Sequence, residues 1–246
     1  ALAFASFQMT VSGQGKSKRP QDLQNEKAVA DPTASDLLFV SRQRLTGNDG
    51  DPDDSFGMSV AISGDTAVIG ASGEDIGPTA NQGAVYIFVR VGTTWTLQAK
   101  LVAFDGGADD NFGTSVAISG DTVVIGSIGD NIGLNTDQGS AYIFIRNGTA
   151  WSEEQKLVAS DGGASDNFGK SVAISGETVV IGSYLDDLGT NFTDQGSAYV
   201  FVRNSGTWSQ QAKLFADDGA ATDYFGHCVS ITSNLVAIGA AGDDIG

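Results

Sequence analysis

The sequence predicts an all-β fold, a β-propeller of four-stranded antiparallel blades. The first indication is a repeat, because the dipeptide Phe-Gly recurs at a spacing of about 56 residues, in the range of propellers, solenoids and arrays. The second is that each period contains four strand-like segments separated by turn residues. Successive strands with short connections form meanders, and meanders packed around an axis form a propeller. A β-solenoid is the alternative, although its coils repeat over far fewer residues. The dipeptides are Phe56-Gly57, Phe112-Gly113, Phe168-Gly169 and Phe225-Gly226.

The first two strands of each repeat follow Phe-Gly directly. In the second repeat, residues 113–119 form the first predicted strand, which ends at the turn residues Gly120 and Asp121. Residues 122–125 form an unbroken β-branched run, which is typical of a strand buried on both faces. A longer loop over 126–138 follows.

The third and fourth strands form a hairpin. Residues 139–146 are the third predicted strand, and the turn Asn147-Gly148 leads to a fourth strand that begins at Trp151. This fourth strand alternates polar and apolar residues, so we expect one packed face and one wet face. A segment with the same pattern at 39–45 precedes the first complete repeat.

The strand tally gives about 3.5 blades. A closed ring of four blades would lack one strand, so we interpret the chain as a fragment of a larger propeller, with further blades of the parent chain as partners. The expected organisation is a signal remnant or polar linker at 1–35, an outer strand of a preceding blade at 36–45, blades at 46–101, 102–157 and 158–214, and the first half of a fourth blade at 215–246.

The charge balance restricts the class of partner. Thirty Asp and Glu against 13 Lys and Arg give a formal net charge of −17. Such a chain repels phosphate, so we expect neither nucleic acid nor an anionic membrane as a partner. No apolar run reaches the roughly 18 residues of a membrane-spanning helix, so no membrane insertion is expected. Cations, and partners with basic or neutral-sugar surfaces, fit this composition better.

Two further motifs recur in register with Phe-Gly. They are Val-Ile-Gly followed by Ala or Ser at 68–71, 124–127, 180–183 and 237–240, where Ala237 replaces the valine, and Gln-Gly beginning at Gln82, Gln138 and Gln195. On these three motifs the chain resembles FG-GAP repeats, the units of the integrin α-subunit head propeller, and is most similar to the versions in secreted or surface proteins of microbes. The resemblance implies a seven-bladed propeller, extracellular or at the cell surface, that binds ligands without chemistry of its own.

The long loops of the repeats carry most of the acidic residues. In a meander, the connection between strands two and three lies at the same end of the blade as the connection to the next blade. We therefore expect one acidic rim, and the resemblance implies that ligands dock on this face. An alternative is that these acids form turns and bond loop amides. The candidate ligand-binding residues are Asp105, Asp109, Asp110, Asp161, Asp166, Asp218 and Asp223.

Calcium is the candidate cofactor. Integrin-like repeats often carry a calcium loop between the first and second strands, but here that connection is as short as Ser63-Gly64-Asp65 and offers too few oxygens. The loops between strands two and three offer carboxylates at both ends, although Asx-turns are the alternative reading. The candidate metal ligands are Glu74, Asp75, Asp130, Asn131, Asp137, Asp186, Asp187 and Asp194.

Catalysis finds little support in the sequence. His227 stands at a position that varies between repeats, so we expect it to be exposed, whereas Cys228 replaces a serine and is expected to be small and buried. Neighbouring strand residues point to opposite faces, which excludes a Cys-His pair. The paired acids repeat with the blades, and we identify no unique polar cluster.

The repeated phenylalanines are expected to pack at the seams between blades. Asn147 and Asn191 match the N-glycosylation pattern.

These observations predict a non-catalytic extracellular binding or adhesion module. Its acidic rim would bind a protein or a glycan, with calcium as a candidate cofactor. The alternative is the propeller part of a secreted polysaccharide-acting hydrolase whose active site lies outside this chain. A purely structural spacer is a third reading.

Overall fold

The computed structural model describes residues 10–11, 43–189 and 193–244. These residues form strands β1 to β16 and no helix, which confirms the all-β prediction. Three sheets contain four antiparallel strands, one contains two antiparallel strands and one contains two parallel strands. Within the predicted segments at 1–35 and 36–45, the structure describes only residues 10–11 and 43–45. Strands β1 (Thr10–Val11) and β2 (Arg44–Leu45) pair there in parallel. Across the described ranges, no helix has the length and hydropathy needed to cross a membrane.

Strands follow chain order within each sheet. The first sheet holds β3 (Phe56–Ser63), β4 (Thr66–Ala71), β5 (Ala84–Val91) and β6 (Thr94–Leu101). The second holds β7 (Phe112–Ser119), β8 (Thr122–Ser127), β9 (Ser140–Asn147) and β10 (Ala150–Leu157). The third holds β11 (Ser171–Ser175), β12 (Thr178–Ser183), β13 (Ser197–Asn204) and β14 (Thr207–Leu214), and the fourth holds β15 (Phe225–Thr232) and β16 (Leu235–Ala240).

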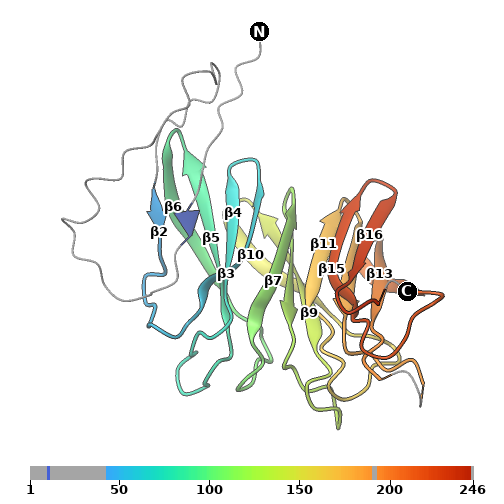
Figure 1. Cartoon of the computed structure of the whole chain (residues 1–246). Coiled ribbons are helices and arrows are strands. Elements are labelled where there is room, and N and C mark those ends of the chain that lie inside the picture. Colours follow the sequence, from blue (N-terminus) through green and yellow to red (C-terminus); the bar gives the residue numbers. More distant parts are fainter. Residues whose placement is uncertain (1–9, 12–42, 190–192, 245–246) are drawn as a thin grey trace, which may run out of the picture.

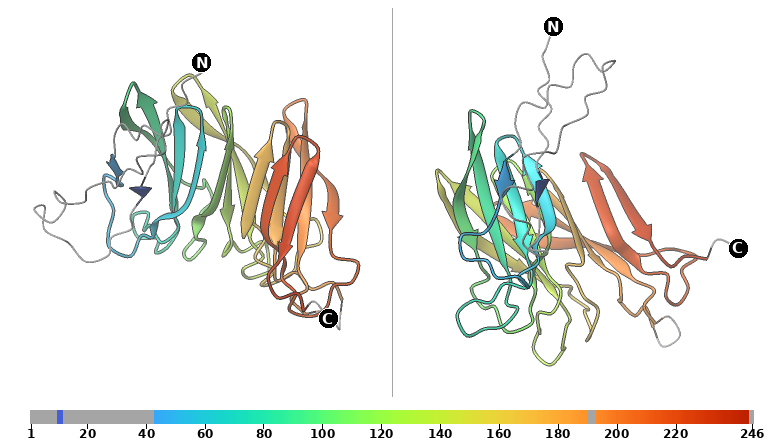
Figure 2. Two further views of the ribbon diagram at one scale, coloured as in Figure 1. Left: turned by 45° about the horizontal axis from the view of Figure 1, so that its top comes forward. Right: turned by 60° about the vertical axis from the view of Figure 1, so that its left-hand side comes forward.

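The sheets stand side by side like propeller blades. In Figure 1 they follow one another in chain order from β3–β6 to β15–β16, with the long loops at the lower edge and the hairpin turns at the upper edge. Figure 2 shows that the described sheets form an open fan rather than a closed ring. The predicted propeller architecture of four-stranded blades is therefore confirmed.

Phe112 and Phe168 of the Phe-Gly pairs fill the seams between neighbouring sheets. Phe112 is fully buried, and its ring meets those of Tyr142 and Phe144 edge to face at centroid distances of 5.3 and 6.0 Å. It also belongs to one hydrophobic cluster with Val85 and Ile87 of the preceding sheet. The prediction that these phenylalanines pack at the seams is confirmed for Phe112 and Phe168, whereas Phe225 is only half-buried.

The glycines of the motifs permit close backbone contact across the same seam. A Cβ atom at Gly70 would lie 2.1 Å from the carbonyl oxygen of Gly113. Gly113 itself has a φ of 95°, in the region that favours glycine. The same contact joins Gly126 to Gly169, where the distance would be 2.0 Å. Any side chain at Gly70 or Gly126 would push two sheets apart.

Hydrogen bonds link the third motif to the next Phe-Gly pair. The Phe112 amide donates to the Gln82 carbonyl at 3.0 Å, and the Phe168 amide donates to the Gln138 carbonyl at 2.8 Å. A serine hydroxyl adds a second link, because Ser59 Oγ donates to the Gly113 carbonyl at 2.7 Å. All three motifs therefore meet at one seam.

Gln43, the residue before β2, contacts the first sheet through two hydrogen bonds. Gln43 Nε2 donates to the Trp95 carbonyl at 2.7 Å, and the Trp95 amide donates to Gln43 Oε1 at 2.8 Å. Gln155 of β10 makes the same pair of bonds to Trp208 in the next sheet. Gln43 thus contacts the first sheet as an outer-strand residue of a preceding blade would.

One prediction about burial is wrong. Cys228 is exposed, not buried. Its counterparts Ser59 and Ser115 face a following sheet, to which each donates a hydrogen bond, but no sheet follows β15 in the described chain. The opposite face of β3 is open for the equivalent reason, with Val60 52% exposed while its counterpart Val116 is buried.

We expect Phe112→Ala to destabilise the fold by about 3–5 kcal/mol, because it leaves a large cavity where two sheets meet. Leu134→Ala is the matched control, since Leu134 is fully exposed and its truncation should cost less than about 0.5 kcal/mol. Urea unfolding of both variants measures the difference. Equal midpoints would show that Phe112 does not support the seam.

Candidate functional site

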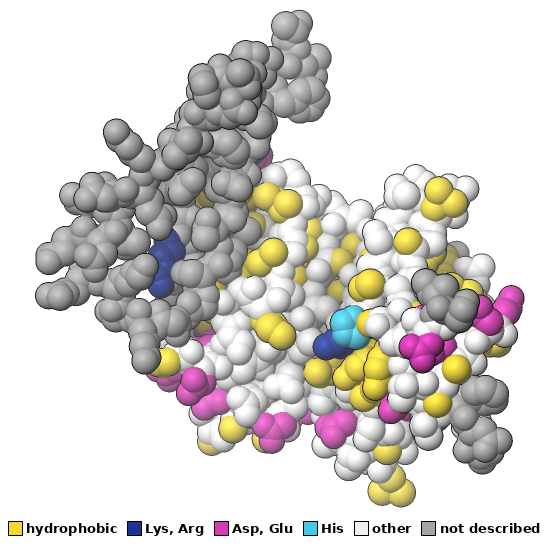
Figure 3. Space-filling model, in the orientation of Figure 1, with side chains coloured by type: hydrophobic (Ala, Val, Ile, Leu, Met, Phe, Trp, Pro, Cys, Tyr) yellow, Lys and Arg dark blue, Asp and Glu magenta, His cyan; other side chains and the backbone are white. Residues whose placement is uncertain are grey.

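The long loops form one rim, which we call the acidic rim. It consists of the loops between the second and third strands of a sheet and the loops that lead to the next sheet. These loops contact each other, because the Asp109 amide donates to the Ala80 carbonyl at 2.9 Å and Asn81 Nδ2 donates to Asp109 Oδ1 at 2.8 Å. Figure 3 shows acidic side chains along this lower edge.

The opposite rim, made of hairpin turns, is electrically balanced. Arg146 is paired there with Asp121 at 2.5 Å, and Arg90 with Asp65 at 2.6 Å. Asn147 ends β9 at this rim and is exposed, whereas Asn191 lies outside the described residues. Glycosylation of either stays a prediction.

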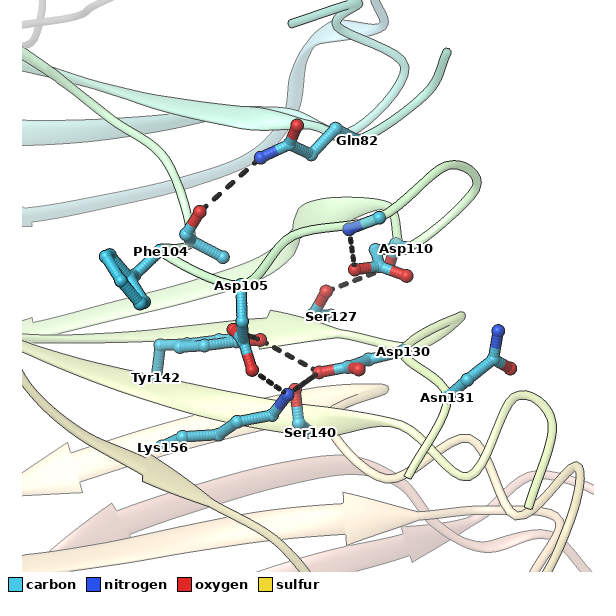
Figure 4. A network of polar contacts seen from close by, with 12 residues as sticks. Gln82, Phe104, Asp105, Asp110, Ser127, Asp130, Asn131, Ser140, Tyr142 and Lys156 are labelled. Atoms are coloured by element: carbon cyan, nitrogen blue, oxygen red, sulfur yellow. Dashed lines mark hydrogen bonds and ion pairs between the residues drawn. The ribbon is translucent and has the colours of Figure 1, made fainter. Parts of the chain in front are cut away.

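On the acidic rim, each complete sheet holds a network of two carboxylates, a tyrosine and a lysine. In the second sheet, Tyr142 Oη donates to Asp105 Oδ1 and to Asp130 Oδ2, both at 2.8 Å. Lys156 Nζ lies 2.7 Å from an oxygen of each carboxylate. Ser140 Oγ donates to Asp130 at 2.5 Å, and Figure 4 shows these side chains converging.

The other two complete sheets repeat the network. Lys100 bridges Asp49 and Glu74 in the first sheet, and Lys213 bridges Asp161 and Asp186 in the third. The tyrosine hydroxyls of Tyr86 and Tyr199 each contact the same two carboxylates as the local lysine. The lysines and tyrosines are residues that sequence reasoning did not assign to the rim, although the basic residue before each strand-final leucine recurs with the blades.

The pKa values in the network follow from this pairing. Burial alone would raise the pKa of Asp105, but hydrogen bonds from Lys156 and Tyr142 outweigh it and lower that pKa. Burial would lower the pKa of Lys156, yet its bonds to Asp105 and Asp130 raise it. Burial and the charge of Asp130 raise the pKa of Tyr142. At neutral pH, Asp105 is therefore ionised, Lys156 is protonated and Tyr142 is neutral.

Three of the predicted ligand-binding residues are buried. Asp110 accepts a hydrogen bond from the Gly107 amide at 2.6 Å, Asp166 from the Gly163 amide at 2.5 Å, and Asp223 from the Ala220 amide at 2.6 Å. Burial raises the pKa of Asp166 to about 6. We reassign these three from ligand contact to loop closure, which is the alternative that the sequence left open.

The remaining four predicted ligand residues are exposed on the acidic rim. They are Asp105, Asp109, Asp161 and Asp218. Two large apolar side chains stand among them, with Phe104 93% exposed and Leu134 fully exposed at a loop tip. The rim thus offers both charge and apolar surface to a partner.

The candidate metal ligands do not converge on one point. The inner acids Glu74, Asp130 and Asp186 are buried and ion-paired with lysines. The next residue in each loop turns away to cap the loop, so that Asp75, Asn131 and Asp187 accept the amide hydrogens of Asn81, Asp137 and Asp194 at 2.8 Å. Figure 4 shows Asn131 directed away from the Asp130 network.

These loops do not fit a calcium site. Calcium requires six to eight oxygen ligands, and nowhere in the described ranges do three or more acidic, His or Cys side chains lie together so that they could hold a metal ion. Calcium binding stays a prediction from the sequence, and the geometry does not support Asp130 as its ligand.

One unique cluster interrupts the repeat, where none was predicted. Tyr184, Tyr224 and His227 have ring contacts, and Lys170 lies over the Tyr184 ring. His227 is exposed, as predicted. Lys170 and His227 occupy the same variable position of neighbouring repeats, so a comparison of repeats would have singled out only Tyr224, which replaces Asn111 and Asn167.

A family model described as FG-GAP repeat matches residues 39–88, 95–144, 151–201 and 208–246. No curated protein matches the chain.

We expect Asp130→Asn to destabilise the protein by about 2–3 kcal/mol, because Lys156 loses a buried partner while keeping some contact with water. Asp121→Asn is the control, since it breaks an exposed ion pair worth less than about 1 kcal/mol. Chemical unfolding at neutral pH compares the two. If both cost the same, the network does not stabilise the rim.

We expect calcium, added at constant ionic strength, to raise the melting temperature no more than matched sodium does. The reason is that the inner carboxylates already have lysine partners, so only screening remains. Thermal melting with and without calcium measures this. A calcium-specific rise that Asp130→Asn with Asp137→Asn diminishes would instead support chelation.

Proposed function

The chain belongs to the FG-GAP repeat family, and from this premise we propose that it is a non-catalytic extracellular binding module whose acidic rim binds a partner protein. Repeats of this family build β-propeller modules that often occur in extracellular and binding proteins. The proposal concerns the exposed part of the rim, because the buried carboxylates are occupied by the fold.

The observation that carries the proposal is the exposure of Phe104 and Leu134 among carboxylates. Large apolar side chains that are exposed and rimmed by polar groups mark interaction sites. Aromatic residues contribute much of the binding energy in protein interfaces, while surrounding charges guide the encounter and select the partner. The exposed acids therefore favour a partner with basic side chains, and Phe104 and Leu134 favour one with an apolar pocket.

The backbone of the loop that carries Phe104 is held in place. The Phe104 amide donates to Glu153 Oε2 at 3.1 Å, and the adjacent Asp105 is bonded to Tyr142 and Lys156. A side chain displayed on a fixed loop loses little conformational entropy when it binds. This arrangement supports a preformed contact point.

The hydrolase alternative receives no support from the complete sheets. Glycoside hydrolysis commonly uses two carboxylates that can reach the sugar. The lysine-bridged pairs, such as Asp105 with Asp130, share a lysine and a tyrosine, and one member of each pair is buried. We therefore retain the non-catalytic proposal.

The test uses a random peptide library displayed on phage and selected on the full 246-residue chain. We expect the selected peptides to be rich in Lys, Arg and apolar residues. Binding of a synthetic selected peptide should weaken at least tenfold in the double variant Phe104→Ser with Leu134→Pro, which places residues of other repeats at both positions. Titration calorimetry measures the affinities.

The control is Asp121→Asn on the opposite rim, which should bind the peptide as the wild type does. Higher salt should weaken binding to the wild type, because rim charges contribute. Selected peptides that bind the rim variant and the wild type equally, or that lack basic residues, would overturn the proposal.

A further inference from the structure

The third seam, between the third and fourth sheets, differs from the other two. At the first two seams, Asn111 Nδ2 donates to the Ser72 carbonyl and Asn167 Nδ2 donates to the Ile128 carbonyl, both at 3.3 Å. At the third seam, Tyr224 replaces the asparagine and Tyr184 replaces the residue that it contacts. A polar contact has thus become a contact between two rings, with centroids 5.8 Å apart.

Two nitrogen-bearing side chains flank this pair of rings. Lys170 Nζ lies 5.1 Å from the centre of the Tyr184 ring, and the His227 ring meets Tyr184 edge to face at 5.6 Å. Lys170 occupies the place of Thr114 in the preceding repeat. Figure 3 shows a histidine beside a basic side chain and a group of hydrophobic side chains on one open face. None of the four residues is fully buried, so a ligand can reach the cluster.

The cluster is maintained despite a strained backbone. Tyr224 has a φ of 57°, a conformation that asparagine adopts more readily than a bulky aromatic residue. Its counterparts Asn111 and Asn167 have φ values of 56° and 52°. Strain of this kind concentrates at ligand-binding and other functional sites. At this φ, a tyrosine lowers the free energy of unfolding relative to an asparagine.

Lys170 stands apart from the other lysines of the sheets. Lys100, Lys156 and Lys213 each bridge two carboxylates, whereas Lys170 forms no ion pair with any residue of the described part of the chain. The chain has a formal net charge of −17, so acidic partners are abundant. Its ammonium group is therefore available to an anion from outside.

We propose that Lys170, Tyr184, Tyr224 and His227 form a binding site for a sugar acid, a pyranose unit that carries a carboxylate. The aromatic rings offer apolar faces to the C–H groups of the sugar ring. Lys170 pairs with the carboxylate, and His227 provides a further hydrogen-bonding group beside it. Asp194 lies next to the cluster, because its backbone carbonyl accepts a hydrogen bond from the Tyr224 amide at 3.2 Å. The amphipathic ring and single charge of a sugar acid match this set.

The site is separate from the acidic-rim surface of Phe104 and Leu134. It therefore goes beyond the proposed function, and either can fail without the other. It is a binding site rather than a catalytic one, because the His227 side chain makes no hydrogen bond to a carboxylate or hydroxyl among the described residues.

The experiment is calorimetric titration of the full chain with trigalacturonate and with uncharged galactotriose. We expect trigalacturonate to bind at least tenfold more tightly than the neutral trisaccharide. Tyr224→Asn and Lys170→Thr should each weaken trigalacturonate binding at least tenfold. Both substitutions introduce the residue of another repeat, and unchanged melting temperatures would show that the fold is kept.

Thr114→Ala and Asp121→Asn are the controls, and both should bind trigalacturonate like the wild type. A triglutamate peptide distinguishes a general anion site from a sugar site and should bind at least tenfold more weakly than trigalacturonate. The proposal is overturned if the wild type binds neither saccharide, if the neutral saccharide or triglutamate binds as tightly, or if Tyr224→Asn and Lys170→Thr retain full affinity.

Discussion

The close backbone contact between neighbouring sheets is the constraint on which the rest of the structure depends. Gly70 and Gly126 lie against the carbonyl oxygens of Gly113 and Gly169, at a distance that excludes any side chain. This contact brings Phe112 and Phe168 into full burial beside both sheets. Because each seam uses the same three motifs, the sheets meet in the same way each time, and the loops at their ends fall on one rim.

On the acidic rim, some acidic side chains make structural contacts and others are exposed to solvent. Bridging lysines take one buried and one exposed carboxylate in each complete sheet, and a second set of aspartates holds the loop amides. These uses fix the loops that carry the remaining exposed acids. Many of the acidic side chains on the rim therefore hold its loops in one conformation and are not available to a partner.

The fold was predictable from the sequence because three signals all predict four strands in each repeat: the alternation of polar and apolar residues, the turn residues and the constant repeat spacing. Residues such as Phe112 and Gly113 also recur unchanged. The network of Tyr142 and Lys156 was not, since it joins residues that are 37 and 51 positions apart through loops without a regular pattern. The prediction that Cys228 is buried was wrong because the burial of this position depends on a following sheet, and not on the residue type. Tyr184 and Tyr224 were overlooked because, taken singly, each is ordinary variation between repeats.

The unit that the family model matches is out of phase with the sheets. The match over 95–144 begins on β6 of the first sheet and ends on β9 of the second, so one unit spans a seam instead of filling a sheet. Duplication or loss of one such unit would therefore carry a complete interface with it. The number of blades can then change without a new contact surface, and one seam, such as the third, can differ while the other two keep their shared contacts.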